Sequence, residues 1–212
     1  MIKHVFFDFN GTIIDDLVLC YDLLNEFLEE QGKEKITLER YKDIFRFPIK
    51  EYYRLAGIDF EKESYESLSI KFIKKYQPAS LKCGLYKEVV PTLKKLNELG
   101  IKCYIISASE KNNLIEQCQS YDIVKYFVDI LGIENIHAKS KVDIAVNYIN
   151  EKKLNKEEVL FIGDTLHDVE VAKAMGVKYA LVSCGHQSLK VLKEANCPIY
   201  NDVSGVLEEI KK

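Results

Sequence analysis

Acidic and hydroxyl side chains follow several short apolar runs in this 212-residue sequence. Asp8 comes directly after one such run, Ser107 after a second, and Asp164 and Asp168 after a third. Carboxylates that meet without a cation repel one another, and the repulsion raises their pKa values. Oxygen ligands at a site that also admits phosphate suit Mg²⁺, which keeps water and phosphate among its ligands. If one fold gathers these side chains, they predict magnesium-assisted phosphoryl transfer.

Apolar runs of strand length alternate with helical patterns over most of the chain. Strands are expected at residues 5–7, 101–106, 126–130, 159–162 and 178–182. Helices are expected at residues 88–99, 111–121, 141–153 and 168–175. This alternation predicts an α/β fold, a doubly wound parallel sheet with helices on both faces. In such a sheet ligands bind outside the carboxyl ends of the strands, which is where Asp8, Ser107 and Asp164 fall.

Residues 16–81 break this rhythm, because they carry helical patterns but no convincing buried strand. Apolar side chains recur there at helical spacing, as on helices that bury one face. We therefore expect a core domain at residues 1–15 and 82–212 and a small helical cap domain at residues 16–81. The many Tyr and Phe side chains of this insert are interpreted as the core of the cap, in preference to a platform for the substrate.

The ordered strand-end motifs resemble those of the haloacid dehalogenase superfamily. Asp8-Phe9-Asn10-Gly11-Thr12 is similar to its first motif, usually written DxDGT, and Ser107 after an apolar strand is similar to its second. Gly163-Asp164-Thr165 with Asp168 is similar to its acidic fourth motif. The resemblance covers essentially the whole chain. It extends to the helical insert, which is similar to the C1-type cap of enzymes resembling phosphoglycolate phosphatase.

The third motif of the superfamily is a lysine, and two positions compete for it. Counting back from Asp164 without gaps favours Lys139, whereas the helix start at Ser140-Lys141-Val142 favours Lys141. We prefer Lys141. Its ammonium group would offset the negative charge of the nucleophile and of the phosphate.

The resemblance implies a role for each motif residue. Asp8 would attack phosphorus and form an aspartyl-phosphate. Mg²⁺ would be bound by Asp8, the backbone carbonyl of Asn10 and Asp164, with Asp168 as a ligand or as a supporting neighbour. The catalytic residues would be Asp8, Asn10, Ser107 and Lys141. The residues that bind the phosphoryl group would be Gly11, Thr12, Ser107, Ala108 and Lys141.

Asn10 departs from the superfamily pattern, in which this position usually holds a second aspartate. That aspartate protonates the leaving oxygen and later activates water, and an amide can do neither. General acid–base help is worth ~10²–10⁴-fold, so its loss raises a barrier by roughly 3–5 kcal/mol. The expected result is a slow phosphatase that favours leaving groups needing no proton, such as those of acyl or aryl phosphates.

The sequence leaves several alternatives open for Asn10. Another group could serve as the base, with His167, His186 or a cap residue as candidates, although both histidines are expected to face solvent. Asn10 could be a substitution introduced to trap an intermediate, or the Asn10-Gly11 dipeptide could deamidate to an aspartate. In a different functional class, the chain could be a catalytically weak protein that binds or senses a phosphorylated metabolite.

Composition restricts the partners and the location. The formal net charge is −3, so neither nucleic acid nor an anionic membrane is expected as a partner. Six cysteines form no C-x-x-C pair, so neither a zinc site nor a disulfide framework is expected. No signal peptide or membrane-length apolar run is present, which predicts a cytoplasmic protein acting on a small phosphorylated metabolite. The oligomeric state is left open, as is the role of the only arginines, Arg40, Arg46 and Arg54.

Overall fold

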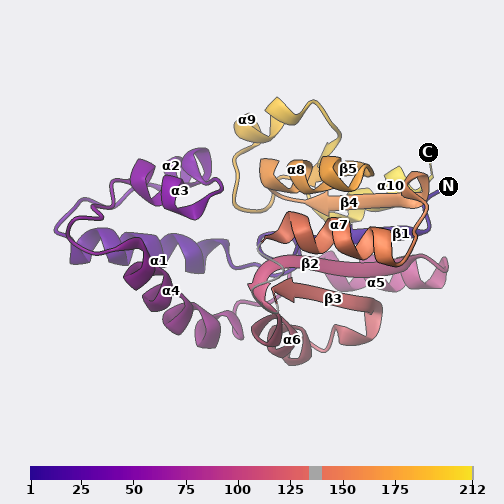
Figure 1. Cartoon of the computed structure of the whole chain (residues 1–212), viewed down its shortest axis with the longest axis horizontal. Coiled ribbons are helices and arrows are strands. Elements are labelled where there is room, and N and C mark those ends of the chain that lie inside the picture. The colour runs from indigo at the N-terminus through magenta and orange to yellow at the C-terminus, as the bar shows by residue number, and fades with distance from the viewer. Residues whose placement is uncertain (134–139, 212) are drawn as a thin grey trace.

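The computed structural model describes residues 1–133 and 140–211 and has two parts (Figure 1). A sheet flanked by helices forms the larger part, which we call the core (residues 1–15 and 82–212). A group of helices inserted after the first strand forms the smaller part, which we call the cap (residues 16–81). Figure 1 shows the cap beside one end of the strands of the core.

The core is built on one sheet whose described strands are all parallel, in the order β3-β2-β1-β4-β5-β6. Their bounds are β1 His4–Phe7, β2 Lys102–Glu110, β3 Phe127–Ile133, β4 Val159–Gly163, β5 Lys178–Val182 and β6 Ile199–Tyr200. Phe7 at the end of β1 is level with Ile105 of β2 and Ile162 of β4. The chain steps outward from β1 in both directions, which confirms the predicted doubly wound sheet. The three strands expected to end in site residues are neighbours.

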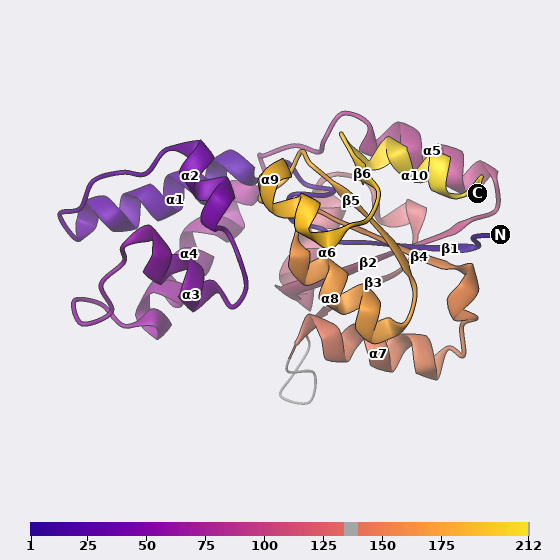
Figure 2. The ribbon, with the colours of Figure 1, turned by 90° about the horizontal axis from the view of Figure 1, so that it is seen from above.

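Helices cover both faces of the sheet (Figure 2). On one face α7 and α8 pack their apolar side chains, Ile144 and Val171 among them, with Phe6 of β1. On the other face α5 and α10 pack with Phe7 of β1, through residues such as Leu93. Strands buried on both faces need apolar side chains at successive positions, which explains the continuous apolar runs of β1 and β4.

The remaining core elements connect these layers. The helices of the core are α5 Val89–Glu98, α6 Lys111–Ser120, α7 Lys141–Glu151, α8 Leu166–Met175, α9 Leu189–Leu192 and α10 Val206–Glu209. Short 3₁₀ helices lie at Val124–Tyr126, Lys156–Glu158, Lys193–Ala195 and Val203–Gly205. In the part of the chain that the structure describes, no helix is long and apolar enough to span a bilayer.

The cap has an apolar core of its own. Its helices are α1 Leu17–Glu30, α2 Leu38–Ile44, α3 Ile49–Ala56 and α4 Tyr65–Ser80. Tyr and Phe side chains contribute heavily to its interior, in which Phe27 and Tyr41 are fully buried. The two connections to the core run side by side, because the N–H of Asp15 donates to the carbonyl of Gly84 at 3.1 Å. This paired connection places the first residue after it, Asp16, at the junction of cap and core.

The observed elements differ from the expected ones mainly at their ends. β2 continues to Glu110, beyond the predicted end at Ile106. α8 begins at Leu166 and not at Asp168, because Thr165 is its N-cap and forms a capping box with Asp168. β6 was not expected, since a strand as short as Ile199–Tyr200 leaves no alternating pattern in the sequence.

Candidate active site

Strand ends of the core converge beneath the cap around a cavity of about 350 Å³. Asp8 directly follows β1, and its N–H donates to the carbonyl of Ile162 at 2.8 Å, which extends the sheet hydrogen bonding to this residue. The expected site residues that line the cavity are Asp8, Asn10, Ser107, Ala108, Lys141, Asp164 and Asp168. Gly11 and Thr12 are not among the lining residues.

Asp8, Asp164 and Asp168 form a buried acidic group in which one oxygen of each lies within 4.8 Å of the others. Burial raises the pKa of Asp8 well above its usual range; Lys141 opposes the rise, and the neighbouring carboxylates add to it. Burial also raises the pKa of Asp164 to about 6, opposed by His186 and reinforced by Asp168. Buried carboxylates that ionise unfavourably gain from a cation between them, and hard oxygen donors fit Mg²⁺.

Asp168 holds the turn after β4 in place. Its Oδ2 accepts hydrogen bonds from the N–H of Thr165 at 2.9 Å, from the Thr165 hydroxyl at 2.8 Å and from the N–H of Asp164 at 3.1 Å. The turn needs glycine at position 163, because a Cβ there would lie 2.3 Å from the Asp168 carboxyl carbon. The other oxygen of Asp168, Oδ1, accepts a hydrogen bond from Lys141 Nζ at 2.5 Å.

Asp164 is held by donors from two loops. Its Oδ1 accepts from the hydroxyl of Thr12 at 3.1 Å, and its Oδ2 accepts from the N–H of His186 at 2.6 Å. Two glycines allow this close approach: a Cβ on Gly11 would lie 2.4 Å from the carboxylate, and one on Gly185 would lie 2.1 Å from it. Gly11 and Thr12 therefore lie behind Asp164, where they position its side chain.

Lys141 is the first residue of α7 and is buried within the acidic group. Its ammonium group pairs with Asp8 and with Asp168. Burial lowers the pKa of Lys141, but the two carboxylates raise it further, so the side chain stays charged. Lys139, the other candidate for the third motif, lies outside the described residues.

Asn10 connects the first motif, the second motif and the cap. Its side-chain N–H₂ donates to Asp16 Oδ2 at 2.9 Å and to the Tyr76 hydroxyl at 2.6 Å. Its side-chain oxygen accepts from the hydroxyls of Ser107 and Ser109, each at 3.3 Å. Both hydrogens and the oxygen of this amide therefore have partners, which fixes its orientation in the cavity wall.

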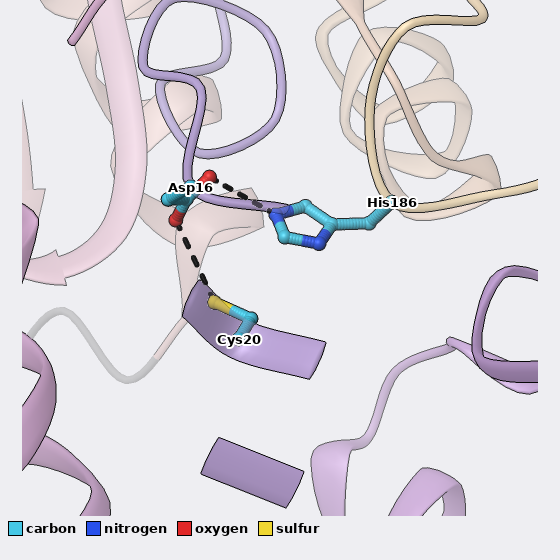
Figure 3. Close-up of side chains that lie close together, drawn as sticks. All are labelled: Asp16, Cys20 and His186. Carbon is cyan, nitrogen blue, oxygen red and sulfur yellow. Dashed lines mark hydrogen bonds and ion pairs between the residues drawn. The ribbon is translucent and has the colours of Figure 1, made fainter. Parts of the chain in front are cut away.

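Asp16 is a site residue that the sequence reasoning missed. It is fully buried and pairs with His186, whose Nε2 lies 3.2 Å from Asp16 Oδ1 (Figure 3). The same oxygen accepts from the N–H of Gly11 at 2.9 Å, and the Tyr76 hydroxyl donates to Oδ2 at 2.6 Å. Figure 3 also shows Cys20, whose Sγ lies 3.7 Å from Oδ2. The sequence signal was only an Asp15-Asp16 pair, which is typical of an ordinary linker.

The surroundings of Asp16 and His186 favour the charged form of each side chain. Burial raises the pKa of Asp16, but His186 and the hydrogen bonds from Tyr76 and Asn10 lower it further, so the pKa lies below its usual value. Burial lowers the pKa of His186, but Asp16 raises it further, so the pKa lies above its usual value. The two side chains face each other across the junction of cap and core, and each favours the charged form of the other.

The expectation that both histidines face solvent is wrong for His186. Its ring is buried, stacks on Phe45 at a centroid distance of 4.7 Å, and lies 2.9 Å from the Tyr41 hydroxyl through Nδ1. The sequence around it carries no pattern that marks a buried histidine. His167 is partly exposed and pairs with the surface carboxylate of Glu170 at 2.9 Å.

Comparisons with known proteins identify the family of this chain. Residues 5–182 match the family model described as haloacid dehalogenase-like hydrolase. A phosphoglycolate phosphatase of Vibrio vulnificus (strain CMCP6) is 27% identical over 184 residues, which cover 82% of this chain and 81% of that protein. The phosphoglycolate phosphatase of Vibrio parahaemolyticus is 22% identical over 218 residues, covering 99% of this chain and 96% of that protein.

Solved structures show the same architecture. A haloacid dehalogenase-like family hydrolase from Streptococcus pneumoniae superimposes with a TM-score of 0.84, covers 99% of this chain and 98% of its own, and is 18% identical. At that identity the likeness concerns the fold alone. The family match over most of the chain carries the assignment. The chain belongs to the haloacid dehalogenase-like hydrolase family and is an enzyme of the phosphatase type, similar to phosphoglycolate phosphatases.

Proposed function

We propose that this protein is a magnesium-dependent phosphatase that hydrolyses a small phosphate ester through an aspartyl-phosphate at Asp8. The supporting observation is the buried acidic group, in which oxygens of Asp8, Asp164 and Asp168 lie within 4.8 Å of one another beside Lys141. A buried nucleophile next to a fixed cation suits attack on a phosphoryl group, because the cation offsets the charge that both carry.

Each residue has a distinct task in the proposed reaction. An oxygen of Asp8 attacks phosphorus, the bond between phosphorus and the substrate oxygen breaks, and that oxygen leaves with the electron pair. Ser107 and the backbone at Ala108 hold the phosphoryl oxygens, and Lys141 offsets the negative charge. Water then attacks phosphorus, the bond to Asp8 breaks, and inorganic phosphate leaves.

The acidic group is the proposed place of the metal. Asp8, Asp164 and the backbone carbonyl of Asn10 would bind Mg²⁺, which supplies charge neutralisation for the transferred phosphoryl group. Asp168 uses one oxygen to fix the turn that carries Asp164, so it acts as a supporting residue for that ligand. Thr12 and Gly11 serve the same purpose from the first motif.

Hydrolysis measured as release of inorganic phosphate tests the proposal. With Mg²⁺ present we expect turnover of a phosphate monoester that chelation by EDTA removes and that Asp8→Ala abolishes. Asp15→Asn is the matched control, because Asp15 is an exposed carboxylate close by in the sequence, and it should keep wild-type activity. Tight binding of the ester without turnover, unchanged by Asp8→Ala, would contradict the proposal and favour a sensing role.

A further inference from the structure

The cavity has an apolar wall that comes from the cap. Its cap-side lining is dominated by aromatic and aliphatic side chains, among them Phe45, Phe47, Tyr52, Tyr65, Phe72 and Ile73. The volume of about 350 Å³ falls in the range of small-molecule sites, which are mostly apolar with a few polar groups. The phosphate-binding residues proposed above supply those polar groups at the opposite, core side.

No cationic side chain of the cap lines the cavity, and the whole cap belongs to the described residues. The single charged cap residue in the lining is Asp16, which is negative. All three arginines of the chain are exposed elsewhere, and Arg54 forms an ion pair with Glu51. Asp16 is paired with His186, which also lines the cavity, so a carboxylate or second phosphate on the substrate would face mainly aromatic rings on the cap side, which is unfavourable in a desolvated site.

Two cap tyrosines that line the cavity have their hydroxyls engaged in hydrogen bonds with neighbouring side chains. The hydroxyl of Tyr76 donates to Asp16 at 2.6 Å, and the hydroxyl of Tyr41 lies 2.9 Å from Nδ1 of His186. With these hydroxyls engaged, the rings offer faces and edges to an occupant. Aromatic side chains bind aromatic ligands through stacked and edge-to-face contacts, and the lining already contains such pairs, as between Phe45 and Phe47 at 6.0 Å.

The chemistry of Asn10 bears on which leaving groups can depart. Its amide cannot transfer a proton, and both of its N–H groups are already donated to Asp16 and Tyr76. An ester whose oxygen leaves as a stable anion needs no acid at this position. A phenol has a pKa of about 10, whereas water, to which simple alcohols are close, has a pKa of about 15.7. An aryl oxide therefore leaves far more easily than an alkoxide.

We propose that the substrate is a phosphate monoester of an uncharged phenol, an inference that rests on the phosphatase function proposed above. The apolar cap wall holds the aromatic ring while the core side holds the phosphate. Asp8 forms a bond to phosphorus, the bond from phosphorus to the aryl oxygen breaks, and the aryl oxide takes a proton from solvent. Water then releases phosphate from Asp8.

Steady-state hydrolysis with Mg²⁺ separates two effects on kcat/KM: binding of the aromatic ring by the cap, and the acidity of the leaving group. Between phenyl and 2-naphthyl phosphate, whose leaving groups differ little in acidity, we expect kcat/KM about tenfold higher for the naphthyl ester, because it buries a second ring. Across substituted phenyl phosphates, log kcat/KM should fall steeply with leaving-group pKa in the wild type. The slope should be flatter in Asn10→Asp, where an acid is restored. Equal slopes would overturn the proposal.

Ile73→Lys tests the cap wall. Ile73 lines the cavity from α4 and is 50% exposed to solvent, so the helix tolerates a lysine there. We expect about fivefold lower kcat/KM for 2-naphthyl phosphate and about fivefold higher kcat/KM for 2-phosphoglycolate, which carries a carboxylate. Ile70→Lys is the matched control, since Ile70 is 71% exposed on the same helix and does not line the cavity. It should change neither value.

The outcomes distinguish the two levels of the proposal. If 2-phosphoglycolate or glycerol phosphate is hydrolysed by the wild type with kcat/KM equal to or above that of 2-naphthyl phosphate, the aryl specificity is wrong while the phosphatase stands. If no ester yields phosphate in a reaction that Asp8→Ala abolishes, the phosphatase function fails and the specificity fails with it.

Discussion

The side-chain N–H₂ of Asn10 donates a hydrogen bond to Asp16 over 2.9 Å, across the junction of core and cap. Asp16 is ionised, because His186 and its hydrogen-bond donors lower its pKa. An amide donor at position 10 is the complement of this buried carboxylate, whereas an aspartate would place two acids in contact. Asn10, which differs from the aspartate usual in the superfamily's first motif, is therefore compatible with the negative charge of Asp16 in the connection to the cap.

Replacing Asn10 with aspartate should destabilise the fold. The Asn10→Asp change removes a partly buried hydrogen bond to Asp16 and adds a like charge beside it, so we expect the free energy of unfolding at pH 7 to fall by about 2 kcal/mol. Urea unfolding measures this change. Asn112→Asp, at an exposed position on α6, is the control and should leave stability within about 0.5 kcal/mol. Equal stability of wild type and Asn10→Asp would show that the hydrogen bond from the Asn10 amide to the Asp16 carboxylate does not stabilise the fold.

The Asp16–His186 pair should add to the free energy of unfolding only within a limited pH range. The folded pKa of Asp16 is lowered, so its contribution is present above the unfolded value of about 3.9 and is lost as pH falls through the folded pKa. The folded pKa of His186 is raised, so its contribution is present below the unfolded value of about 6.5 and is lost as pH rises through the folded pKa.

A His186→Gln variant tests this window. The difference in unfolding free energy between wild type and variant should be largest between about pH 4 and pH 6.5 and should shrink on either side. The measurements are made in EDTA, so that no bound metal contributes to the difference. A difference that is constant from pH 3 to pH 9 would show that the pair carries no charge.

Magnesium should stabilise the protein more at pH 8 than at pH 5. Protons and metal compete for the acidic group, and Asp164 has a pKa of about 6, so more of it is available to a cation at the higher pH. Thermal unfolding with millimolar Mg²⁺ or with EDTA measures the effect as a shift in Tm. Asp164→Asn should remove most of the shift at pH 8, and Asp15→Asn should keep it. The prediction is refuted if the shift is the same at both pH values.

Gly185 should be essential to the position of Asp164. In Gly185→Ala the new Cβ would lie 2.1 Å from the Asp164 carboxylate and 2.4 Å from the carbonyl of Gly11, so the acid must move. We expect phosphatase activity to fall by about 100-fold or more, since displacing a reacting group by about 1 Å has that effect. The Mg²⁺-dependent shift in Tm should fall with it.

Gly100→Ala is the control for this change. Gly100 has a positive φ, of 74°, and an added Cβ there meets nothing within 4 Å. The variant should lose about 1 kcal/mol of stability through backbone strain and keep both activity and its response to Mg²⁺. If Gly185→Ala behaves like Gly100→Ala, Asp164 does not depend on the close approach of that loop.

The sequence by itself determined the sheet and the core side of the site. Apolar runs and helical spacing are local properties, and they predicted strands β1 to β5 and helices α5 to α8 to within a few residues at their ends. Since parallel strands end at one edge, the residues after β1 and β4 had to meet, and Asp8 and Asp164 do lie together. The resemblance to a known family then left Lys139 and Lys141 as candidates for the third motif, and the preferred one, Lys141, pairs with Asp8 and Asp168.

Only the tertiary structure decided which residues face the carboxyl ends of the strands from the side of the cap. Asp16 and His186 are 170 residues apart, and no local pattern predicts that a linker acid and a loop histidine become buried together. The aromatic residues of the cap show the same limit, because their helical spacing predicts a buried face but not that this face also lines a cavity. Burial and pairing depend on which surfaces the chain brings together over long distances, and such contacts leave no signal in the spacing of residues.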